Sequence, residues 1–319
     1  MNIVITGGAG FVGSHLADAL LARGHYVYAL DNLITGRRQN IAHLEAEPRF
    51  AFRLHDVCEP LPPLRCEALF HLASPASPEG YGAHPIETLL TNAHGTLHAL
   101  ELARTNGAKF LISSTSEVYG DPLEHPQSET YWGNVNPVGP RSCYDEGKRY
   151  AEALTINYLR VYGVDARIVR IFNTYGPRNA PDDGRVVPNF LTQAIQGRPL
   201  TVYGDGAQTR SFCYVSDLVE GLQRAMFTEG TKGEVINLGN PGEFTIRELA
   251  ELAVQVTRSA SPIQSVEARP EEIAQRRPDI AKAKALLSWE PTVPLAEGLR
   301  LTADWMRLQP EVIAATTDR

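Results

Sequence analysis

The stretch Thr6-Gly7-Gly8-Ala9-Gly10-Phe11-Val12-Gly13 decides the fold, because it joins the apolar run Ile3–Ile5 to a segment with helical spacing. A glycine-rich turn between a buried strand and a helix leaves the N–H groups of the helix N-terminus free to bind an anion. The glycines at positions 7, 10 and 13 permit a tight turn, close approach of a pyrophosphate and close packing of helix on strand. The stretch therefore predicts a dinucleotide-binding unit, with a glycine-rich turn that binds no ligand as the alternative.

Short β-rich runs alternate with longer helical patterns over the first 170 residues. A helical pattern from Phe11 to Arg23 is followed by an apolar strand at Tyr26–Leu30. Strands that are apolar throughout, rather than alternating, indicate a parallel sheet covered on both faces. We therefore predict an α/β protein with a Rossmann-type doubly wound parallel sheet. Further strands are expected at Ala68–Leu72, Lys109–Ser113 and Asp165–Ile171, and further helices at Pro85–Arg104 and Asp145–Tyr162.

The pattern changes after Phe172, where segments rich in Pro, Gly and Asp interrupt shorter elements. A strand at Gly233–Leu238 followed by a helix from Thr245 indicates that the chain returns to the first sheet. Short helices are expected near Ile280–Leu287 and Leu295–Met306. We therefore predict a smaller and less regular C-terminal lobe set against the sheet domain.

Composition and charge exclude several classes of protein. Hydrophobic residues make up 43% and charged residues 21% of the 319 residues, which is typical of a globular chain and not of a disordered one. The net charge of -7, without a basic stripe, argues against a nucleic-acid binder. No apolar run reaches the roughly 18 residues of a membrane span, and no signal peptide is evident. Four cysteines without a CxxC pattern and nine histidines without ligand spacing predict a reduced, cytoplasmic protein with no metal site.

The residue that ends the second predicted strand points to the cofactor. Asp31 lies where a carboxylate can bind both hydroxyls of an adenosine ribose, and it would repel a 2′-phosphate. The sequence therefore favours NAD over NADP, although Arg37 and Arg38 lie close enough to leave NADP as an alternative. Asp31 as a simple helix cap is the second alternative.

Tyr144 and Lys148 are four residues apart at the start of a predicted helix, which places both on one face. A phenol with a pKa of about 10 is a poor base at neutral pH. A nearby ammonium group and an oxidised nicotinamide ring both favour the phenolate, and so make the tyrosine a usable base. A surface tyrosine beside a solvated lysine is the alternative.

The run from Ser113 to Gly120 follows the strand expected at Lys109–Ser113, at the edge of the sheet where α/β proteins bind ligands. Its hydroxyl groups could share a proton with a substrate alcohol, and Glu117 adds a carboxylate to that edge. A Ser/Thr-rich turn that hydrogen-bonds to itself would explain the hydroxyl groups but not Glu117.

With these residues in place, the chain resembles the extended short-chain dehydrogenase/reductases, and within them the UDP-glucuronate decarboxylases (UDP-xylose synthases) along nearly its whole length. The resemblance is carried by the residue ranges 6–13, 71–78, 114–122, 125–129, 136–149, 171–174 and 208–210. Such long matched runs are more specific than the glycine turn or the Tyr/Lys pair alone.

The resemblance implies a reaction sequence. Tyr144, with Lys148 and Thr115, takes the proton of the sugar C4 hydroxyl while the C4 hydride passes to NAD. The resulting ketone is β to the C6 carboxylate, so carbon dioxide can leave with its electrons delocalised into an enolate. Protonation at C5 and return of the hydride then give UDP-xylose, or UDP-4-keto-pentose if the reduced cofactor escapes.

The resemblance also assigns roles in the second half of the reaction. Glu117 and Arg210 flank the reacting carboxylate and C5, and Ser116 orients the carboxylate. Arg210 bound to the carboxylate alone would stabilise the ground state and slow the reaction. We therefore expect Arg210 to stabilise the enolate or to relay the C5 proton, with a structural ion pair as the alternative.

Ligand-binding residues follow from the same resemblance. Residues 1–172 are expected to form the NAD-binding domain, with 211–240 returning to it, and 173–319 mainly the nucleotide-sugar-binding lobe. The expected cofactor-binding residues are Gly7, Gly10, Phe11, Val12, Gly13, Asp31, Asn32, Thr35, Gly36, Asp56, Val57, Leu72, Ala73, Ser74, Thr91, Tyr144, Lys148, Thr174 and Arg185. The expected substrate-binding residues are Pro75, Tyr81, Thr115, Ser116, Glu117, Arg141, Asn173, Tyr203 and Arg210.

Two alternative functions stay open at this point. A UDP-glucuronate 4-epimerase is the nearest competitor, although epimerases usually lack a counterpart of Glu117, and a 4,6-dehydratase would carry Asp where Ser116 stands. A catalytically inactive NAD-sensing protein would be expected to lack Tyr144 or Lys148. The loop 178–183 departs from the animal members of the family, which bears on how tightly NAD is held. Relatives pair through two helices, so a homodimer with a four-helix bundle is expected at Pro85–Arg104 and Asp145–Tyr162.

Overall fold

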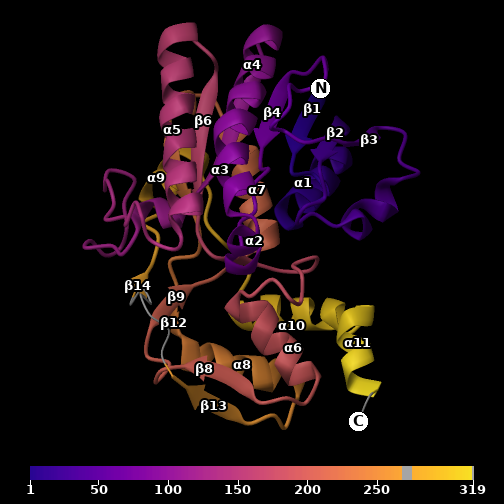
Figure 1. Ribbon diagram of the computed structural model, residues 1–319, viewed down its shortest axis with the longest axis vertical. Helices are drawn as coiled ribbons and strands as arrows, with labels where there is room; N and C mark the ends of the chain where they lie inside the picture. Colours follow the sequence, from indigo (N-terminus) through magenta and orange to yellow (C-terminus); the bar gives the residue numbers. More distant parts are fainter. Residues whose placement is uncertain (268–274, 318–319) are drawn as a thin grey trace.

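A computed structural model describes residues 1–267 and 275–317; the other residues of the predicted C-terminal lobe lie outside this range. Six strands of the N-terminal part and β11 from the returning segment form a seven-stranded sheet in the order β11-β6-β5-β4-β1-β2-β3, in which every pair of neighbours is parallel. Figure 1 shows this sheet domain above the C-terminal lobe. This confirms the doubly wound α/β sheet. Its strands are β1 (Asn2–Thr6), β2 (Tyr26–Asp31), β3 (Phe50–Leu54), β4 (Ala68–His71), β5 (Lys109–Thr115), β6 (Ala166–Ile171) and β11 (Val235–Leu238).

Successive side chains of a strand point to opposite faces of the sheet, and a hydrophobic core covers each face. Ile3 and Ile5 pack with helices α1 (Phe11–Ala22) and α7 (Val215–Phe227) on one face. Val4, between them, packs with α4 (Thr96–Asn106) and α5 (Ser142–Tyr162) on the other. Burial on both faces explains why the strands are apolar throughout.

The strand order reverses between β1 and β4, because the chain first builds β1, β2 and β3 outward and then returns to place β4 on the other side of β1. In doubly wound sheets the ligand crevice lies at this point, outside the carboxyl ends of the strands. The glycine turn after β1 and the Ser/Thr run after β5 both lie at these ends. The fold thus brings the two predicted ligand segments to one edge.

The helix expected at Pro85–Arg104 is present, but it is not α-helical throughout. It consists of α3 (Pro85–Leu90), a π-helical turn at Thr91–Gly95, and α4. Within the turn, Asn92 Nδ2 donates to the carbonyl of Thr88 and to the Ser74 hydroxyl, which ties the irregular segment to the loop after β4. π-turns are frequent at functional sites, and this one brings Thr91 to the crevice.

The C-terminal lobe is built from short strands and helices, as the sequence predicts, but several of its elements carried no clear pattern. The helix from Thr245 is α8 (Ile246–Thr257), whose N-terminus has a capping box between Thr245 and Glu248. Neither α6 of this lobe nor α7, which covers one face of the sheet, was predicted from the sequence. The other elements are α2 (Pro78–Ala83), α6 (Val186–Ile195), α9 (Ala281–Leu287), α10 (Leu295–Met306), α11 (Pro310–Thr317), β7 (Thr174–Tyr175), β8 (Leu200–Tyr203), β9 (Thr209–Ser211), β10 (Cys213–Tyr214), β12 (Glu243–Thr245), β13 (Ile263–Val266), β14 (Gln275–Arg276) and the 3₁₀ turns Arg38–Leu44 and Ser116–Tyr119.

Two absences hold for the part of the chain that the structure describes. Within it, no helix combines the length and apolar character that crossing a bilayer requires. The same residues contain no group of three or more His, Cys, Asp or Glu side chains placed to hold a metal ion. All four cysteines are free.

Candidate active site

The first cavity, here called the cofactor cavity, lies at the strand-order reversal and is built on the glycine turn. Gly7 has a φ of 74°, which favours glycine, and its N–H donates to the carbonyl of Leu30 at 2.8 Å. A Cβ on Gly13 would collide with the carbonyl oxygen of Gly7. The turn therefore keeps the helix N-terminus close to β1, as a pyrophosphate site requires.

Most of the predicted cofactor residues line this cavity. They are Gly7, Gly10, Phe11, Val12, Gly13, Asp31, Asn32, Thr35, Gly36, Val57, Leu72, Ala73, Ser74, Thr91 and Arg185. Tyr144, Lys148 and Thr174 line the adjoining cavity instead. Asp56 does not line the cavity. It accepts hydrogen bonds from Asn32 Nδ2 and the Cys58 N–H, and it thereby holds the lining residue Asn32 in place.

Asp31 lies where a carboxylate is needed to bind the hydroxyl groups of the adenosine ribose. Its carboxylate accepts the N–H groups of Ala9 at 3.0 Å and Leu33 at 2.8 Å, and burial raises the pKa of this side chain. Arg37, by contrast, is paired with Asp182 and Glu311. Because these carboxylates already engage the arginine, the local charges favour a cofactor without a 2′-phosphate.

The cofactor cavity also contains buried polar atoms that need partners. His55 Nε2, Arg178 Nη1 and Asn179 Nδ2 line it and have no hydrogen-bond partner among the described residues. Buried donors and acceptors are normally satisfied, so these atoms fit a polar ligand. His55 was not predicted, because it comes from a loop without a local motif, whereas Arg178 and Asn179 belong to the loop 178–183 that the sequence already connects with NAD binding. Ile34 and Asn40 also line the cavity and were not predicted, while Arg37 was considered only for its effect on NADP, and Ala180 and Asp183 only as part of the loop 178–183.

The glycine turn gives a first prediction. We expect Gly13→Ala to weaken NAD binding by about tenfold to a hundredfold, because the collision with the Gly7 carbonyl costs about 1–3 kcal/mol. Isothermal titration calorimetry measures this affinity. Gly82→Ala is the matched control, since a Cβ there meets no atom within 4 Å. Equal NAD affinities of Gly13→Ala and the wild-type protein would contradict the assignment.

The second cavity, here called the sugar cavity, has a volume of about 270 Å³ and contains the Tyr/Lys pair. Tyr144 is buried, its hydroxyl is hydrogen-bonded to Thr115, and its ring stacks on Tyr81 with the centroids 5.2 Å apart. Lys148 Nζ donates to the carbonyl of Ser113 at 2.8 Å and lies 5.9 Å from the centre of the Tyr144 ring. The structure thus brings the predicted proton-transfer residues together.

Burial shifts the two members of this pair in opposite directions. It raises the pKa of Tyr144 to about 12 and lowers the pKa of Lys148 to about 7. Both shifts disfavour the charged form, because the groups have lost contact with water. A positive charge brought close to the phenol would reverse the first shift and make the tyrosine a base.

Glu117 is the centre of a charged cluster in the same cavity. Its carboxylate forms ion pairs with Arg141 and Arg276. Burial raises the pKa of Glu117, but the charges of Arg276, Arg141 and Arg210 outweigh it and lower the pKa below its usual value. Glu117 is therefore ionised at neutral pH and is held between positive groups.

Arg276 is a site residue that the sequence analysis missed. It lies on β14, 159 residues from Glu117 in the sequence, and is buried against Glu117 and the carbonyl of Gly120. Only the arginine pair before Pro278 marks it in the sequence, and no local periodicity connects it to the site. Arg210, on β9, lines the sugar cavity as predicted and donates from Nη1 to the carbonyl of Thr209.

A third cavity, the nucleotide cavity, adjoins the sugar cavity through Asn173, Arg185 and Arg210, which line both. Tyr203 lines it as predicted. Phe190 and Phe212 add an apolar wall that the sequence analysis missed. The structure places the other predicted substrate residues Tyr81, Thr115, Ser116, Glu117 and Arg141 in the sugar cavity, and Pro75 in the cofactor cavity instead.

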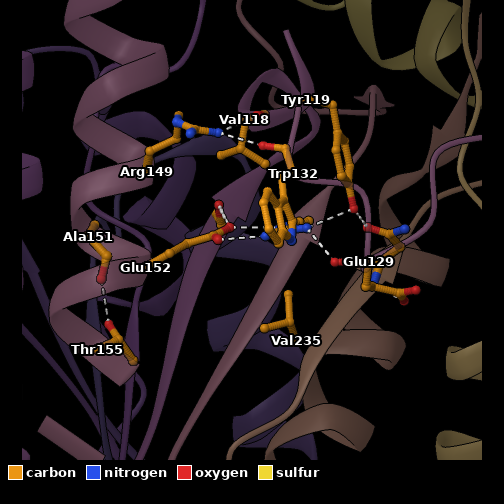
Figure 2. A network of polar contacts seen from close by, with 12 residues as sticks. Val118, Tyr119, Glu129, Trp132, Arg149, Ala151, Glu152, Thr155 and Val235 are labelled. Atoms are coloured by element: carbon orange, nitrogen blue, oxygen red, sulfur yellow. Dashed lines mark hydrogen bonds and ion pairs between the residues drawn. The ribbon is translucent and has the colours of Figure 1, made fainter. Parts of the chain in front are cut away.

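Glu152 and Arg170 form a buried ion pair close to Lys148. Glu152 follows Lys148 by one helical turn on α5, and its carboxylate accepts two hydrogen bonds from Arg170 and one from Ser114 (Figure 2). Arg170 also donates to Tyr119, whose hydroxyl donates to Asn237 Oδ1. This network joins α5 to β5, β6 and β11, and the charge of Glu152 opposes the loss of the Lys148 proton.

Comparison with known proteins places this geometry in a family. The family model described as GDP-mannose 4,6 dehydratase matches residues 4–302. UDP-glucuronic acid decarboxylase 1 of Arabidopsis thaliana is 56% identical over 96% of this chain and 70% of its own length. UDP-glucuronic acid decarboxylase 6 of the same plant is 54% identical over 97% of this chain and 90% of its own.

A solved structure agrees with the fold and the cavities. UDP-glucuronic acid 4-epimerase from Bacillus cereus, in complex with UDP-glucuronic acid and NAD, is 31% identical over 96% of this chain and 99% of its own, with a TM-score of 0.85. The sequence relatives are more similar than this structural neighbour. The chain therefore belongs to the UDP-glucuronic acid decarboxylase family, within the extended short-chain dehydrogenase/reductases, and is an enzyme of the carboxy-lyase class.

Proposed function

We propose that this enzyme converts UDP-glucuronate to carbon dioxide and UDP-xylose through a 4-keto intermediate, with NAD as a cofactor that is regenerated in each cycle. The observation that carries the proposal is the position of the Tyr144–Lys148 pair beside the Glu117 cluster in one sugar cavity. That cavity lies between one suited to a dinucleotide and one suited to a uridine diphosphate. The two flanking cavities would therefore hold NAD and the uridine diphosphate group of the substrate, with the sugar between them.

The ligands divide between the two parts of the chain. Residues 1–172, joined by the returning segment 211–240, hold most of the cofactor, while 173–319 supply most of the nucleotide cavity. The loop 178–183 also reaches the cofactor cavity through Arg178 and Asn179. NAD, when bound, accepts a hydride from the sugar and later returns it.

Tyr144 acts as the base that takes the C4 hydroxyl proton. Thr115 is hydrogen-bonded to the phenol and orients it. Lys148 supports the phenolate by its charge, and its own proton is stabilised by Glu152. General base catalysis by a group positioned in this way contributes about 10²–10⁴ to a rate.

The arginine cluster serves the decarboxylation step. Arg141, Arg210 and Arg276 surround a single ionised Glu117, so the cavity carries a net positive charge that attracts the anionic substrate. After C4 oxidation the carboxylate is β to a ketone, and its electrons move into an enolate. Arg210 and Arg276 stabilise that enolate, Ser116 orients the carboxylate, and Glu117 opposes its charge.

UDP-glucuronate labelled with ¹³C at C6 tests the proposal. The enzyme should release labelled carbon dioxide and bicarbonate, with no net change in the redox state of NAD. An unchanged labelled sugar would contradict decarboxylation. Conversion of the label to UDP-galacturonate would instead support the 4-epimerase alternative, which the B. cereus neighbour represents. Tight NAD binding without turnover would support the NAD-sensing alternative.

Glu117 gives a prediction that separates the two steps. We expect Glu117→Gln to lower the decarboxylation rate by about 10²-fold and C4 oxidation much less, because the ion-pair cluster loses its central charge. The primary isotope effect of C4-deuterated substrate on kcat should then fall toward unity. Glu124→Gln, an exposed change in the loop after Glu117, is the control. Equal losses in both steps would contradict this role.

We also propose that the enzyme is a homodimer formed through α3, α4 and α5. Ile86 on α3 and Val161 on α5 are 62% and 69% exposed, and α3 packs along α5. An apolar surface of this kind is typical of an interface. The other exposed apolar residues on these helices are Leu89, Leu90, Leu97, Tyr150 and Tyr162.

Sedimentation measures this association. The wild-type protein should be a dimer at micromolar concentration, and Ile86→Lys should shift it toward the monomer, because a charge would be buried in the interface. Leu54→Lys changes an equally exposed leucine on the edge strand β3 and should have no effect. A monomeric wild-type protein would remove the proposal.

A further inference from the structure

A fourth cavity of about 330 Å³, here called the side cavity, reaches the Glu117 cluster from another direction. Glu117 and Arg141 line both the side cavity and the sugar cavity, so they form the wall between them. The side cavity shares no described lining residue with the cofactor or nucleotide cavity. The side cavity therefore approaches the reacting centre from a direction that neither the cofactor cavity nor the nucleotide cavity uses. The remaining lining residues are Gly120, Asp121, Asn134, Val135, Asn136, Gly139, Pro140 and Asp145.

Asp145 lies where the side cavity meets the cluster. It follows Tyr144 in the first turn of α5, is only 8% exposed, and its Oδ1 has no hydrogen-bond partner among the described residues. Arg141 Nε and Arg276 Nε, in the same cluster, are also buried without a partner there. Buried polar atoms are rarely left unsatisfied, and Asp145 and Arg141 line the side cavity, so their atoms favour water reaching the cluster from that cavity.

The charges around Asp145 favour its protonated form. Burial raises the pKa of Asp145 to about 7, and the neighbouring charge of Glu117 adds to this, while Arg141 and Arg276 oppose it. A carboxyl group with a pKa near neutrality can both give and take a proton at working pH. The other titratable groups that face it are Tyr81, Cys143, Tyr144 and Glu146.

The proposed reaction needs such a group, and the present inference rests on that reaction. When carbon dioxide leaves, the C5–C6 bond breaks and its electron pair remains on C5 as an enolate. One proton must then form the new C5–H bond. The C4 proton and hydride are returned within the cycle, so this C5 proton comes from solvent in every turnover. The substrate and cofactor meanwhile occupy the larger cavities.

We propose that Asp145 relays this proton from solvent in the side cavity to the reacting centre. Its carboxyl group gives a proton to the Glu117 carboxylate, Glu117 gives a proton to C5 of the enolate, and the resulting Asp145 carboxylate takes another proton from water. Asp145 does not touch the substrate; it acts through Glu117. The side cavity is thus the proton entrance of the enzyme.

Chemical rescue tests the relay. We expect Asp145→Ala to lower kcat by about 10–10²-fold, because the C5 proton source is lost. Imidazole at fixed pH should restore activity several-fold in proportion to its concentration, since the side cavity admits a small proton donor. Asp145→Asn, nearly the same shape, should be equally slow and should show a larger solvent deuterium isotope effect. Glu146→Ala, which removes the next carboxylate on α5, is the control. Imidazole should not raise its activity, and its solvent deuterium isotope effect should equal that of the wild-type enzyme.

Each outcome decides the proposal. Wild-type kcat in the folded variants, or a loss that imidazole does not restore, would overturn it. Titration of the ¹³C-labelled Asp145 carboxyl group in the wild-type protein adds a measurement that needs no variant. A protonated carboxyl at pH 6 supports the relay, and an ionised one overturns it. If the wild-type protein releases no carbon dioxide from UDP-glucuronate, the proposed function fails instead, and the titration still reports on Asp145.

Discussion

Tyr144→Phe is expected to lower kcat by about 10³-fold while the affinity for NAD stays unchanged. The variant keeps the ring that stacks on Tyr81 but loses the hydroxyl that is hydrogen-bonded to Thr115. Burial raises the pKa of this phenol to about 12, although the hydrogen bond from Thr115 and the charge of Arg185 lower it, so we expect the added positive charges of Lys148 and the oxidised cofactor to make it a base. Without the hydroxyl, the site loses the group that takes the C4 proton in the proposed reaction.

Product formation followed by NMR and NAD binding followed by calorimetry measure the two parts of this prediction. Tyr26→Phe is the control, because Tyr26 lies on β2, is 50% exposed and is outside the sugar cavity. The control should keep wild-type activity. Activity of Tyr144→Phe within tenfold of the wild-type enzyme would show that another group is the base.

Arg170→Met is expected to destabilise the protein by roughly 3–5 kcal/mol, because it leaves the buried Glu152 without its partner. Arg170 and Glu152 are each nearly nine-tenths buried and are joined by two hydrogen bonds. The loss extends beyond the pair, since Arg170 also donates to Tyr119 and to the carbonyl of Glu129.

Denaturant unfolding measures this free energy. Arg300→Met is the matched control, because the Arg300–Asp304 pair has the same chemistry but is about half exposed, and such pairs contribute about 0–1 kcal/mol. The double variant Arg170→Met/Glu152→Met should regain part of the lost stability, since no uncompensated charge remains. A loss no larger than that of Arg300→Met would show that the network in Figure 2 is not a structural anchor.

Local patterns in the sequence predict the centre of the fold well. The glycine turn, the apolar strands and the helix beginning near Asp145 each depend on a few adjacent residues, and the structure has them within a few positions. The four-residue spacing of Tyr144 and Lys148 is a property of one helix, so the sequence alone could pair them. The structure confirms that both side chains line one cavity.

Long-range contacts explain what the sequence could not predict. Arg276 reaches Glu117 only because β14 pairs with β9, and neither strand has a clear local pattern. The π-turn at Thr91–Gly95 depends on side-chain bonds from Asn92 rather than on helix propensity. The unusual environment of Asp145 likewise depends on Glu117 and Arg276, which are distant in the sequence, and only Arg141, at the N-cap of the same helix, is close to it.

The product formed from UDP-glucuronate tests the assignment of this site most directly. Proton NMR of the purified enzyme with this substrate, with and without added NAD, shows both the product and the state of the cycle. We expect UDP-xylose to accumulate without a stoichiometric need for added NAD, or UDP-4-keto-pentose with reduced cofactor if the hydride is not returned. Accumulation of UDP-galacturonate with the C6 carboxylate intact, or no change in the substrate, would contradict the assignment of this site to decarboxylation.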